Sequence, residues 1–135
     1  MIKFNRQSDY ALVLATELAI DHKKGNWVPL SVVADKYNLS VKFLGSVAGI
    51  LRKKGLILSK EGTGGGYALA QDPREIMIGD ILYATLTDSA PSLCTSSIGC
   101  VNEKKCPAKP VWGVVQGVLE EVLFSISLKS LLKIK

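Results

Sequence analysis

The sequence predicts a mainly α-helical fold that carries one small β-hairpin and ends in a long C-terminal helix. Three observations support this prediction. Apolar residues recur at helical spacing in several segments of the first 54 residues. A glycine-rich turn at 61–66 separates two short segments of strand-forming residues. A long helical pattern of apolar residues begins at Pro110.

The first helix is predicted over Asp9–Ile20. Its apolar residues share one helical face and comprise Tyr10, Leu14, Ala15, Leu18 and Ala19. Glu17 interrupts this run, which is too short to span a membrane and lacks a cleavage site, so we expect a cytoplasmic protein. The helix should end in the polar stretch 21–26, where Gly25 is a stop signal and His22 is expected to face solvent.

Two further helices are predicted before the hairpin. The second covers Ser31–Tyr37 after Pro29, with Val33, Ala34 and Tyr37 on one face. Ser40 is expected as the N-cap of the third helix, which runs to about Lys54. Gly55 stands where a C′ glycine ends a helix. The predicted buried stripe of the third helix comprises Phe43, Leu44, Val47, Ile50 and Leu51.

The hairpin is predicted from the strands Leu56–Lys60 and Tyr67–Ala70 and the turn Glu61–Gly66. Two helices with a short turn, followed by a hairpin, are the element order of a winged helix-turn-helix. We therefore expect residues 1–75 to form a DNA-binding domain whose third helix enters the major groove. The glycine turn joins two strands and lacks the ending of a P-loop, so no nucleotide site is predicted.

Candidate DNA contacts lie on the outward face of the third helix and on the hairpin. Side chains of that helix face would meet base edges and phosphates, and backbone amides of the hairpin would lie along phosphates. The predicted contact residues are Ser40, Val41, Lys42, Ser46, Arg52, Lys53, Gly64, Gly65 and Tyr67. The alternative is that this helix face is exposed and has no partner.

Residues 76–135 are expected to hold a metal-binding loop and a dimerisation helix. A short helix is predicted over Gly79–Leu86, and the loop Leu93–Cys106 contains every cysteine. The long helix that begins at Pro110 has an apolar side formed by Trp112, Val115, Leu119, Val122, Leu123 and Ile126. A helix this apolar must bury its stripe, and packing on a second copy of the chain is the simplest arrangement.

The charge balance favours an acidic partner. The chain has 17 Lys and Arg against 12 Asp and Glu, a net charge of +5, and a pI of about 9.2. Nucleic acid is the commonest partner of such a chain. The 47% hydrophobic content is typical of a globular protein. No nucleophile–base pair, paired carboxylates or complete metal–water motif stands out and only one histidine is available, so an enzyme is not predicted.

The three cysteines follow a regular spacing that indicates a metal or cluster site. Cys94, Cys100 and Cys106 are separated by five residues each time. Structural zinc prefers closer cysteine pairs and four protein ligands, so this spacing favours an iron–sulfur cluster over zinc. Lys104 and Lys105 would help to keep the sulfurs deprotonated. Free redox-active thiols are the alternative that the residues leave open.

Several motifs together resemble the Rrf-two family of bacterial transcription regulators. They are the run LGSVAGILRKKGLI at 44–57, the glycine turn followed by Tyr67 and Leu69, the IMIGDI segment at 76–81, and the cysteine spacing. The resemblance implies a homodimer in which a long C-terminal helix crosses between the subunits. It also implies that Cys94, Cys100 and Cys106 ligate a [2Fe-2S] or [4Fe-4S] cluster.

The resemblance also bears on the fourth ligand of the cluster. IscR-like members of the family have a histidine three residues after the third cysteine, where this chain has Lys109. NsrR-like members use an aspartate near the start of the first helix of the other subunit, and Asp9 occupies that place. Asp9 is therefore the candidate fourth ligand, which favours a [4Fe-4S] cluster. The alternative is that Asp9 only caps the first helix.

The resemblance implies a regulator whose operator affinity follows nitric oxide, redox state or cluster supply. Two departures indicate an operator different from that of IscR-like members, namely Glu61 at the base of the wing and Gly45 in the third helix. Two alternatives remain: a metal-free thiol-redox regulator of the same fold, and an iron–sulfur cluster carrier that needs no DNA-reading helix.

Overall fold

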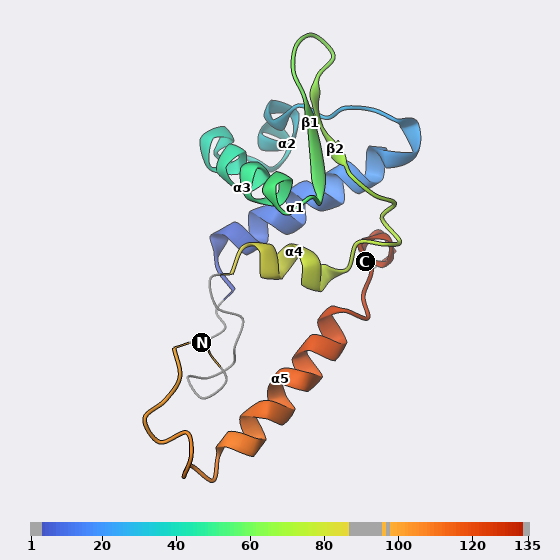
Figure 1. The fold of residues 1–135 in the computed structure, drawn as a ribbon. Coiled ribbons are helices and arrows are strands. Elements are labelled where there is room, and N and C mark those ends of the chain that lie inside the picture. Colours follow the sequence, from blue (N-terminus) through green and yellow to red (C-terminus); the bar gives the residue numbers. More distant parts are fainter. Residues whose placement is uncertain (1–3, 87–95, 97, 134–135) are drawn as a thin grey trace.

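The computed structural model describes residues 4–86, 96 and 98–133 of the chain, and Cys94 lies outside them. The described part is mostly helical and contains a two-stranded antiparallel sheet, which confirms the predicted fold class (Figure 1). The elements are α1 (Arg6–Asp21), the 3₁₀ turn η1 (His22–Lys24), α2 (Leu30–Tyr37), α3 (Val41–Lys53), β1 (Ile57–Lys60), β2 (Gly66–Leu69), α4 (Ile78–Ala84), α5 (Lys109–Leu123) and α6 (Leu128–Leu131).

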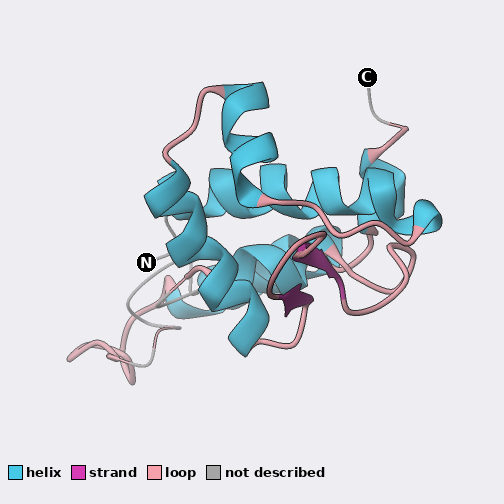
Figure 2. Ribbon diagram, turned by 90° about the horizontal axis from the view of Figure 1, so that it is seen from above, coloured by secondary structure: helices cyan, strands magenta, loops and turns pink. Residues whose placement is uncertain are grey.

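The main core is built around α1. Figure 1 shows α2, α3 and the hairpin on one side of α1 and α4 on the other, and the view in Figure 2 looks down on the hairpin end. All five residues predicted for the apolar face of α1 are buried. Burial of such side chains contributes about 1.5–3 kcal/mol for each large residue, so α1 is the element that holds the others together.

Local sequence signals set the bounds of α3. Ser40 caps the helix as predicted, because its Oγ accepts a hydrogen bond from the Phe43 amide at 3.2 Å. Gly55 follows the helix with φ +76°, a left-handed conformation that glycine adopts without steric cost. Leu44, Val47 and Leu51 are completely buried against α1 and α2. The cap, the stop and these three buried residues were predictable from neighbours in sequence, whereas Phe43 and Ile50, also predicted for the buried stripe, are only half-buried.

The wing is fixed both by its own register and by the segment before α2. Ile57 pairs with Leu69 at the base of the hairpin. The backbone of Tyr67 also exchanges two hydrogen bonds with Val28, at 2.8 and 2.9 Å. A Cβ atom on Gly66 would lie 2.5 Å from the Val28 carbonyl group, closer than any side chain allows. Glycine at position 66 therefore lets the backbone around Val28 pack directly against the hairpin.

Glu17 is a buried carboxylate in the middle of α1. It accepts a hydrogen bond from the Tyr37 hydroxyl and pairs with the Lys36 ammonium at 3.0 Å. The hydrogen bond and charge of Glu17 raise the pKa of Lys36 above its usual value, and the same carboxylate raises the pKa of Tyr37. Tyr37, the last residue of α2, is exposed, whereas Val33 and Ala34 on the same helix are buried, and its hydroxyl donates to the Glu17 carboxylate.

The C-terminal helix ends earlier than the apolar pattern predicts. The predicted stripe continues to Ile126, but α5 ends at Leu123. The residues that follow pair with the segment before α4: the Ile78 amide donates to the Ile126 carbonyl at 2.9 Å, and the Leu128 amide donates to the Ile76 carbonyl at 2.7 Å. This long-range pairing ends the helix, so the prediction of one continuous stripe was wrong at its last residue.

The short helix α6 returns the chain to the core. Ser127 caps it by accepting a hydrogen bond from the Ser130 amide, and Leu128 is completely buried in the cluster around α1. Both α4 and α6 therefore pack against the first helix of the predicted DNA-binding domain. The division of the chain at residue 75 stays a prediction. None of the helices in the described part is long and apolar enough to cross a membrane.

Candidate nucleic-acid interface and metal site

The outward face of α3 presents polar and basic side chains to solvent. Val41, Lys42, Ser46 and Lys53 are exposed along it, and Ser40 is exposed at its start. The Ser46 hydroxyl donates to the Lys42 carbonyl at 3.3 Å, which leaves its oxygen facing outward. The backbone therefore presents these predicted contact residues on one accessible helix face, as a helix that enters a major groove requires.

Arg52 joins this helix face to the wing. Its Nη1 donates a hydrogen bond to the Ser59 hydroxyl of β1 at 3.3 Å, and both side chains are exposed. A guanidinium has further donors, so Arg52 remains able to contact a phosphate while it holds this bond. Ser59 was not predicted as a functional residue, because nothing near it in sequence marks a contact with the preceding helix.

The three hairpin residues predicted to touch DNA differ in accessibility. Gly64 is exposed at the tip with φ +75°. The Gly65 amide donates to the Gly62 carbonyl at 3.0 Å, and the Tyr67 amide donates to Val28, so both amides are used within the protein. The Tyr67 side chain also packs against the core. Among these three residues, Gly64 is the one accessible for contact with a DNA phosphate. Gly65 and Tyr67 instead stabilise the conformation of the wing through their hydrogen bonds within the protein.

A cation–π contact braces the base of the wing. The Lys60 ammonium lies 5.8 Å from the centre of the Trp27 ring, which belongs to the segment between η1 and α2. Glu61 is exposed next to Lys60, where its carboxylate would repel a nearby phosphate. Trp27 is a second residue that sequence reasoning missed, since the contact spans more than thirty positions.

Asp9, the candidate fourth ligand, is exposed in the first turn of α1. The capping alternative for Asp9 is wrong, because the N-cap is Asn5, whose side chain accepts a hydrogen bond from the Ser8 amide at 3.1 Å. The Ser8 hydroxyl forms a buried 3.0 Å hydrogen bond with the Thr85 hydroxyl at the end of α4. The start of α1 therefore lies against the point from which the chain leaves α4 toward the cysteines.

The part of the cysteine loop that the structure describes is a series of turns before α5. Cys100 and Cys106 are both half-buried free thiols. The Cys100 carbonyl accepts from the Glu103 amide at 3.0 Å, and the Cys106 amide donates to the Asn102 carbonyl at 2.9 Å. The described residues contain no group of three potential metal ligands, so Asp9, Cys100 and Cys106 do not meet within one described chain.

Lys109 occupies the position at which IscR-like relatives were expected to carry a ligand. Its ammonium pairs with the Glu103 carboxylate at 2.6 Å, and both side chains are more than 40% exposed. The pair closes the turn that contains Cys106. Lys109 therefore has a local partner of its own within this segment, and its cationic amine is not a metal ligand.

The helix α5 exposes an apolar face along most of its length. Figure 1 shows α5 extending away from the other helices, and only Leu123 at its end is buried. A shallow groove of about 420 Å³ is lined by the exposed Val114, Val115, Val118 and Val122 together with the half-buried Leu119. Isolated exposed apolar residues are common, but a contiguous valine face of this kind marks an interaction surface.

An aromatic joint connects α5 to α4. The rings of Tyr83 and Phe124 meet edge to face with centroids 5.5 Å apart. A Cβ on Gly79 would lie 2.6 Å from the Phe124 ring, so glycine lets the ring lie directly on α4. The Tyr83 hydroxyl is buried without a hydrogen-bond partner among the described residues, and this burial raises its pKa.

Comparison with known proteins points to one family. Residues 4–134 match the family model named Rrf2, described as an iron-dependent transcriptional regulator. A protein named HTH-type transcriptional regulator IscR, from Photorhabdus laumondii, is 28% identical over 130 residues, which are 96% of this chain and 79% of that protein.

Two solved structures share the fold along almost the whole chain. CymR, described as the global cysteine regulator of B. subtilis, is 32% identical, with a TM-score of 0.82 over 97% of this chain and 96% of that one. The T. potens IscR is also 32% identical, with a TM-score of 0.78 over 98% of this chain and 87% of that one. Both similarities extend through the winged helices and the C-terminal helix.

Proposed function

The chain belongs to the Rrf2 family of transcriptional regulators, and from this membership we propose that it acts as a homodimer whose affinity for an operator is set by an iron–sulfur cluster. The observation that carries DNA binding is the exposed face of α3, which Arg52 ties to the wing through Ser59. This contact holds the helix and the hairpin in one orientation, so that both can follow the same DNA duplex.

The proposed DNA contacts are the predicted residues on α3 together with Gly64 of the wing, and they have different roles. Lys42, Lys53 and Arg52 neutralise phosphates, because cations on the edge of a helix in the major groove lie close to the backbone. Val41 and Ser46 face base edges, where a short apolar or hydroxyl side chain fits against a thymine methyl or a polar base edge. Gly64 lets the tip of the wing approach the sugar–phosphate backbone.

DNA binding is tested by selecting an operator from random duplexes and measuring its affinity at several salt concentrations. Replacing Lys42 or Lys53 with Ala should weaken binding and lower the salt slope by about one, as expected for one lost phosphate contact. Lys24→Ala in η1 is the matched control and should leave both quantities unchanged. Failure to enrich any sequence, with the chain folded, would favour the cluster-carrier alternative.

The proposed dimer uses the exposed valine face of α5. Two such helices packed together would remove Val114, Val115, Val118 and Val122 from water, which the described single chain leaves exposed. A symmetric pair is the simplest arrangement, because the same apolar stripe then serves both subunits. In this arrangement the paired α5 helices connect α3 of one subunit, the helix proposed to enter the major groove, to α3 of the other. The orientation of α5 then sets the distance between the two α3 helices.

The proposed cluster ligands are Cys94, Cys100 and Cys106 from one subunit and Asp9 from the other. The half-buried thiols of Cys100 and Cys106 have the donor chemistry that a cluster requires. The exposure of Asp9 suits a ligand that reaches a second chain. An iron–sulfur cluster would supply redox chemistry and reactivity toward nitric oxide and oxygen.

The residues around the proposed ligands explain how loss of the cluster would change the position of α5 relative to α1. Ser8 and Thr85 hold the first turn of α1 against the end of α4, and the cysteine segment leads directly into α5. Cysteines tied to Asp9 of the partner would thus fix α5 relative to both first helices. Release of the cysteines would free α5 and change the distance between the two α3 helices. The dimer would then shift from one populated arrangement to another.

The similarity to CymR favours a second candidate function, in which the cysteines act as metal-free redox thiols. A visible spectrum with iron and sulfide assays on chain purified without oxygen separates the two. About four irons per chain would support the proposed [4Fe-4S] cluster and about two would indicate [2Fe-2S] and weaken the case for Asp9. Colourless, iron-free protein that cannot be reconstituted would favour the thiol regulator.

Two variants test the ligand assignment. Cys100→Ala should abolish the colour and change operator affinity, because one of three sulfur ligands is lost. Asp9→Ala should change the visible spectrum or shorten the lifetime of the cluster. Asp35→Ala, which removes another exposed carboxylate from α2, is the control and should leave the spectrum unchanged. Unaltered operator affinity in Cys100→Ala would overturn sensing while leaving DNA binding intact.

A further inference from the structure

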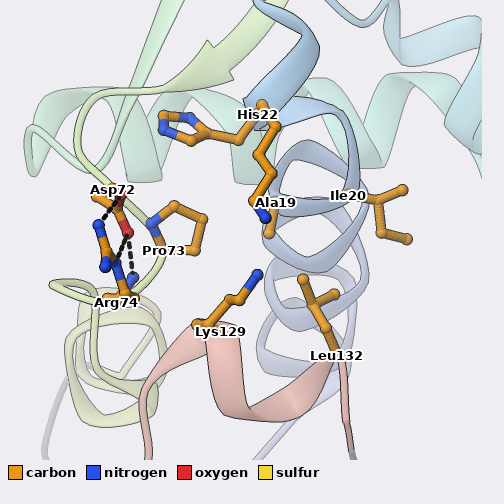
Figure 3. A pocket seen from close by; sticks show the side chains of 9 residues that line it. Ala19, Ile20, His22, Asp72, Pro73, Arg74, Lys129 and Leu132 are labelled. Carbon is orange, nitrogen blue, oxygen red and sulfur yellow. Dashed lines mark hydrogen bonds and ion pairs between the residues drawn. The ribbon is translucent and has the colours of Figure 1, made fainter.

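A cavity of about 360 Å³ lies where three distant parts of the chain meet (Figure 3). Its walls come from the end of α1 with η1, from the 72–74 turn after the wing, and from α6. The Lys129 amide donates to the Pro73 carbonyl at 3.0 Å, which fixes α6 to that turn. Cavities of this size bind small molecules in other proteins.

The cavity has an excess of positive charge. His22, Lys23 and Lys129 line it, and Figure 3 shows the Lys129 ammonium extending into the space toward Ala19. The one carboxylate in the wall, Asp72, is bound to Arg74 through two guanidinium contacts, at 3.0 and 3.1 Å. Since Arg74 neutralises Asp72, the ammonium groups of Lys23 and Lys129 remain to attract an anion, and the His22 ring can donate a hydrogen bond to it.

The remaining wall is apolar. Pro73 and Leu132 line the same space from the turn and from the end of α6. An inorganic anion would leave this apolar wall unused, whereas a ligand with a short hydrocarbon chain would cover it.

We propose that this cavity binds a small organic carboxylate with a branched or short apolar chain. The carboxylate would lie between Lys23, Lys129 and His22, and the chain against Pro73 and Leu132. An inorganic phosphate would leave the apolar wall uncovered and should therefore bind more weakly than an organic carboxylate. Bound there, the ligand would hold α6 against the end of α1. This inference stands on the cavity alone and does not depend on DNA or cluster binding.

The test is a titration of the full chain with 4-methylpentanoate, followed by amide NMR. Saturable shifts are expected at Lys23, Arg74 and Lys129. Lys129→Gln and Lys23→Gln should each weaken binding about tenfold, the loss expected for one charged hydrogen bond. Lys24→Gln is the matched control, because Lys24 is also in η1 but pairs with Asp21 at 3.4 Å and does not line the cavity.

Two further probes separate the proposal from a simple basic patch. The neutral 4-methylpentanol should not bind, and inorganic phosphate should bind more weakly than the carboxylate. Absence of saturable shifts would overturn the proposal. Equal binding of phosphate, or binding that is unchanged in both folded Lys→Gln variants, would overturn it as well.

Discussion

At the scale of single residues, two glycines of the wing differ in what surrounds them. Gly64 and Gly66 both have positive φ, but a Cβ on Gly64 would meet open space and one on Gly66 would lie 2.5 Å from Val28. Gly64→Ala should therefore cost about 1 kcal/mol of unfolding free energy, the usual penalty for a left-handed residue. Gly66→Ala should cost more than about 2 kcal/mol, because strain adds to the collision.

Urea unfolding of both wing variants checks this difference. Gly64→Ala is the matched control, since it introduces the same methyl group two positions away in the same turn. Equal losses of stability would contradict the close approach of Val28 to the hairpin. A larger loss of stability in Gly66→Ala would support it. The close approach of Val28 would then explain why the wing needs glycine at position 66 as well as at its tip.

The ion pair of Asp72 and Arg74 should make stability depend on pH in the acid range. The hydrogen bond from the Arg74 guanidinium, together with that from the Arg74 amide, lowers the pKa of Asp72 from its ordinary 3.8 to about 2. A folded pKa below the unfolded one means that the stabilisation is complete above about pH 4 and disappears as the pH falls toward 2. Asp72→Asn should therefore flatten the loss of stability over this range.

Thermal unfolding of metal-free protein between pH 2 and 5 provides the measurement. Glu75→Gln is the control, because it removes a neighbouring exposed carboxylate outside this ion pair. The parent chain and Asp72→Asn should differ most above pH 4 and converge near pH 2. Parallel curves across the whole range would show that the pair adds nothing to stability, as is common for exposed ion pairs.

At the scale of elements, the joint between α4 and α5 depends on one glycine and one ring. A methyl group at Gly79 would displace the Phe124 ring, which lies 2.6 Å from the Cβ position. Gly79→Ala should cost about 1–3 kcal/mol, the typical penalty of overpacking. In a chain that already carries Phe124→Ala, the same substitution should cost much less, since the colliding ring is absent.

A double-mutant cycle measures this coupling. Phe124→Ala alone should lose about 0.5–1.5 kcal/mol with its edge-to-face contact to Tyr83. The two substitutions together should be less destabilising than their sum by about 1 kcal/mol or more. Additive losses would contradict the view that the ring lies on Gly79, and α5 would then be held to α4 by other contacts.

At the scale of the whole molecule, the described chain leaves α5 without a covering surface. Val118 is 55% exposed at the middle of the valine face. Val118→Glu should leave the fold intact, because the side chain contacts solvent, but should place a charge in the proposed dimer interface, where burial of an unpaired charge is costly. The expected outcome is a folded monomer, measured by analytical ultracentrifugation and circular dichroism.

The matched control for the dimer is Glu121→Gln on the same helix, which should remain dimeric. A dimeric Val118→Glu chain, or a monomeric parent chain at micromolar concentration, would contradict the proposal. Should the variant be monomeric, its operator affinity should fall steeply, because two linked reading helices bind a duplex far more tightly than one.

The sequence by itself determined the elements that depend on near neighbours. The cap at Ser40, the stop at Gly55, three of the five residues in the predicted stripe of α3 and the hairpin around 61–66 were predictable, because each follows from residues a few positions apart. The motifs together also identified the family, which the match over residues 4–134 confirms.

Only the tertiary structure decided features that join residues far apart in sequence. The apolar pattern continues through Ile126, and α5 ends earlier because that segment pairs with the residues before α4. His22 was expected in solvent but lines a cavity closed by α6, more than one hundred residues later. The N-cap of α1 is Asn5 and not Asp9. Several polar residues near the start of the helix could have filled this position, and the sequence did not decide among them. The physical reason is common to all three cases: a sequence pattern states what each segment prefers, and the packing of the whole chain selects among those preferences.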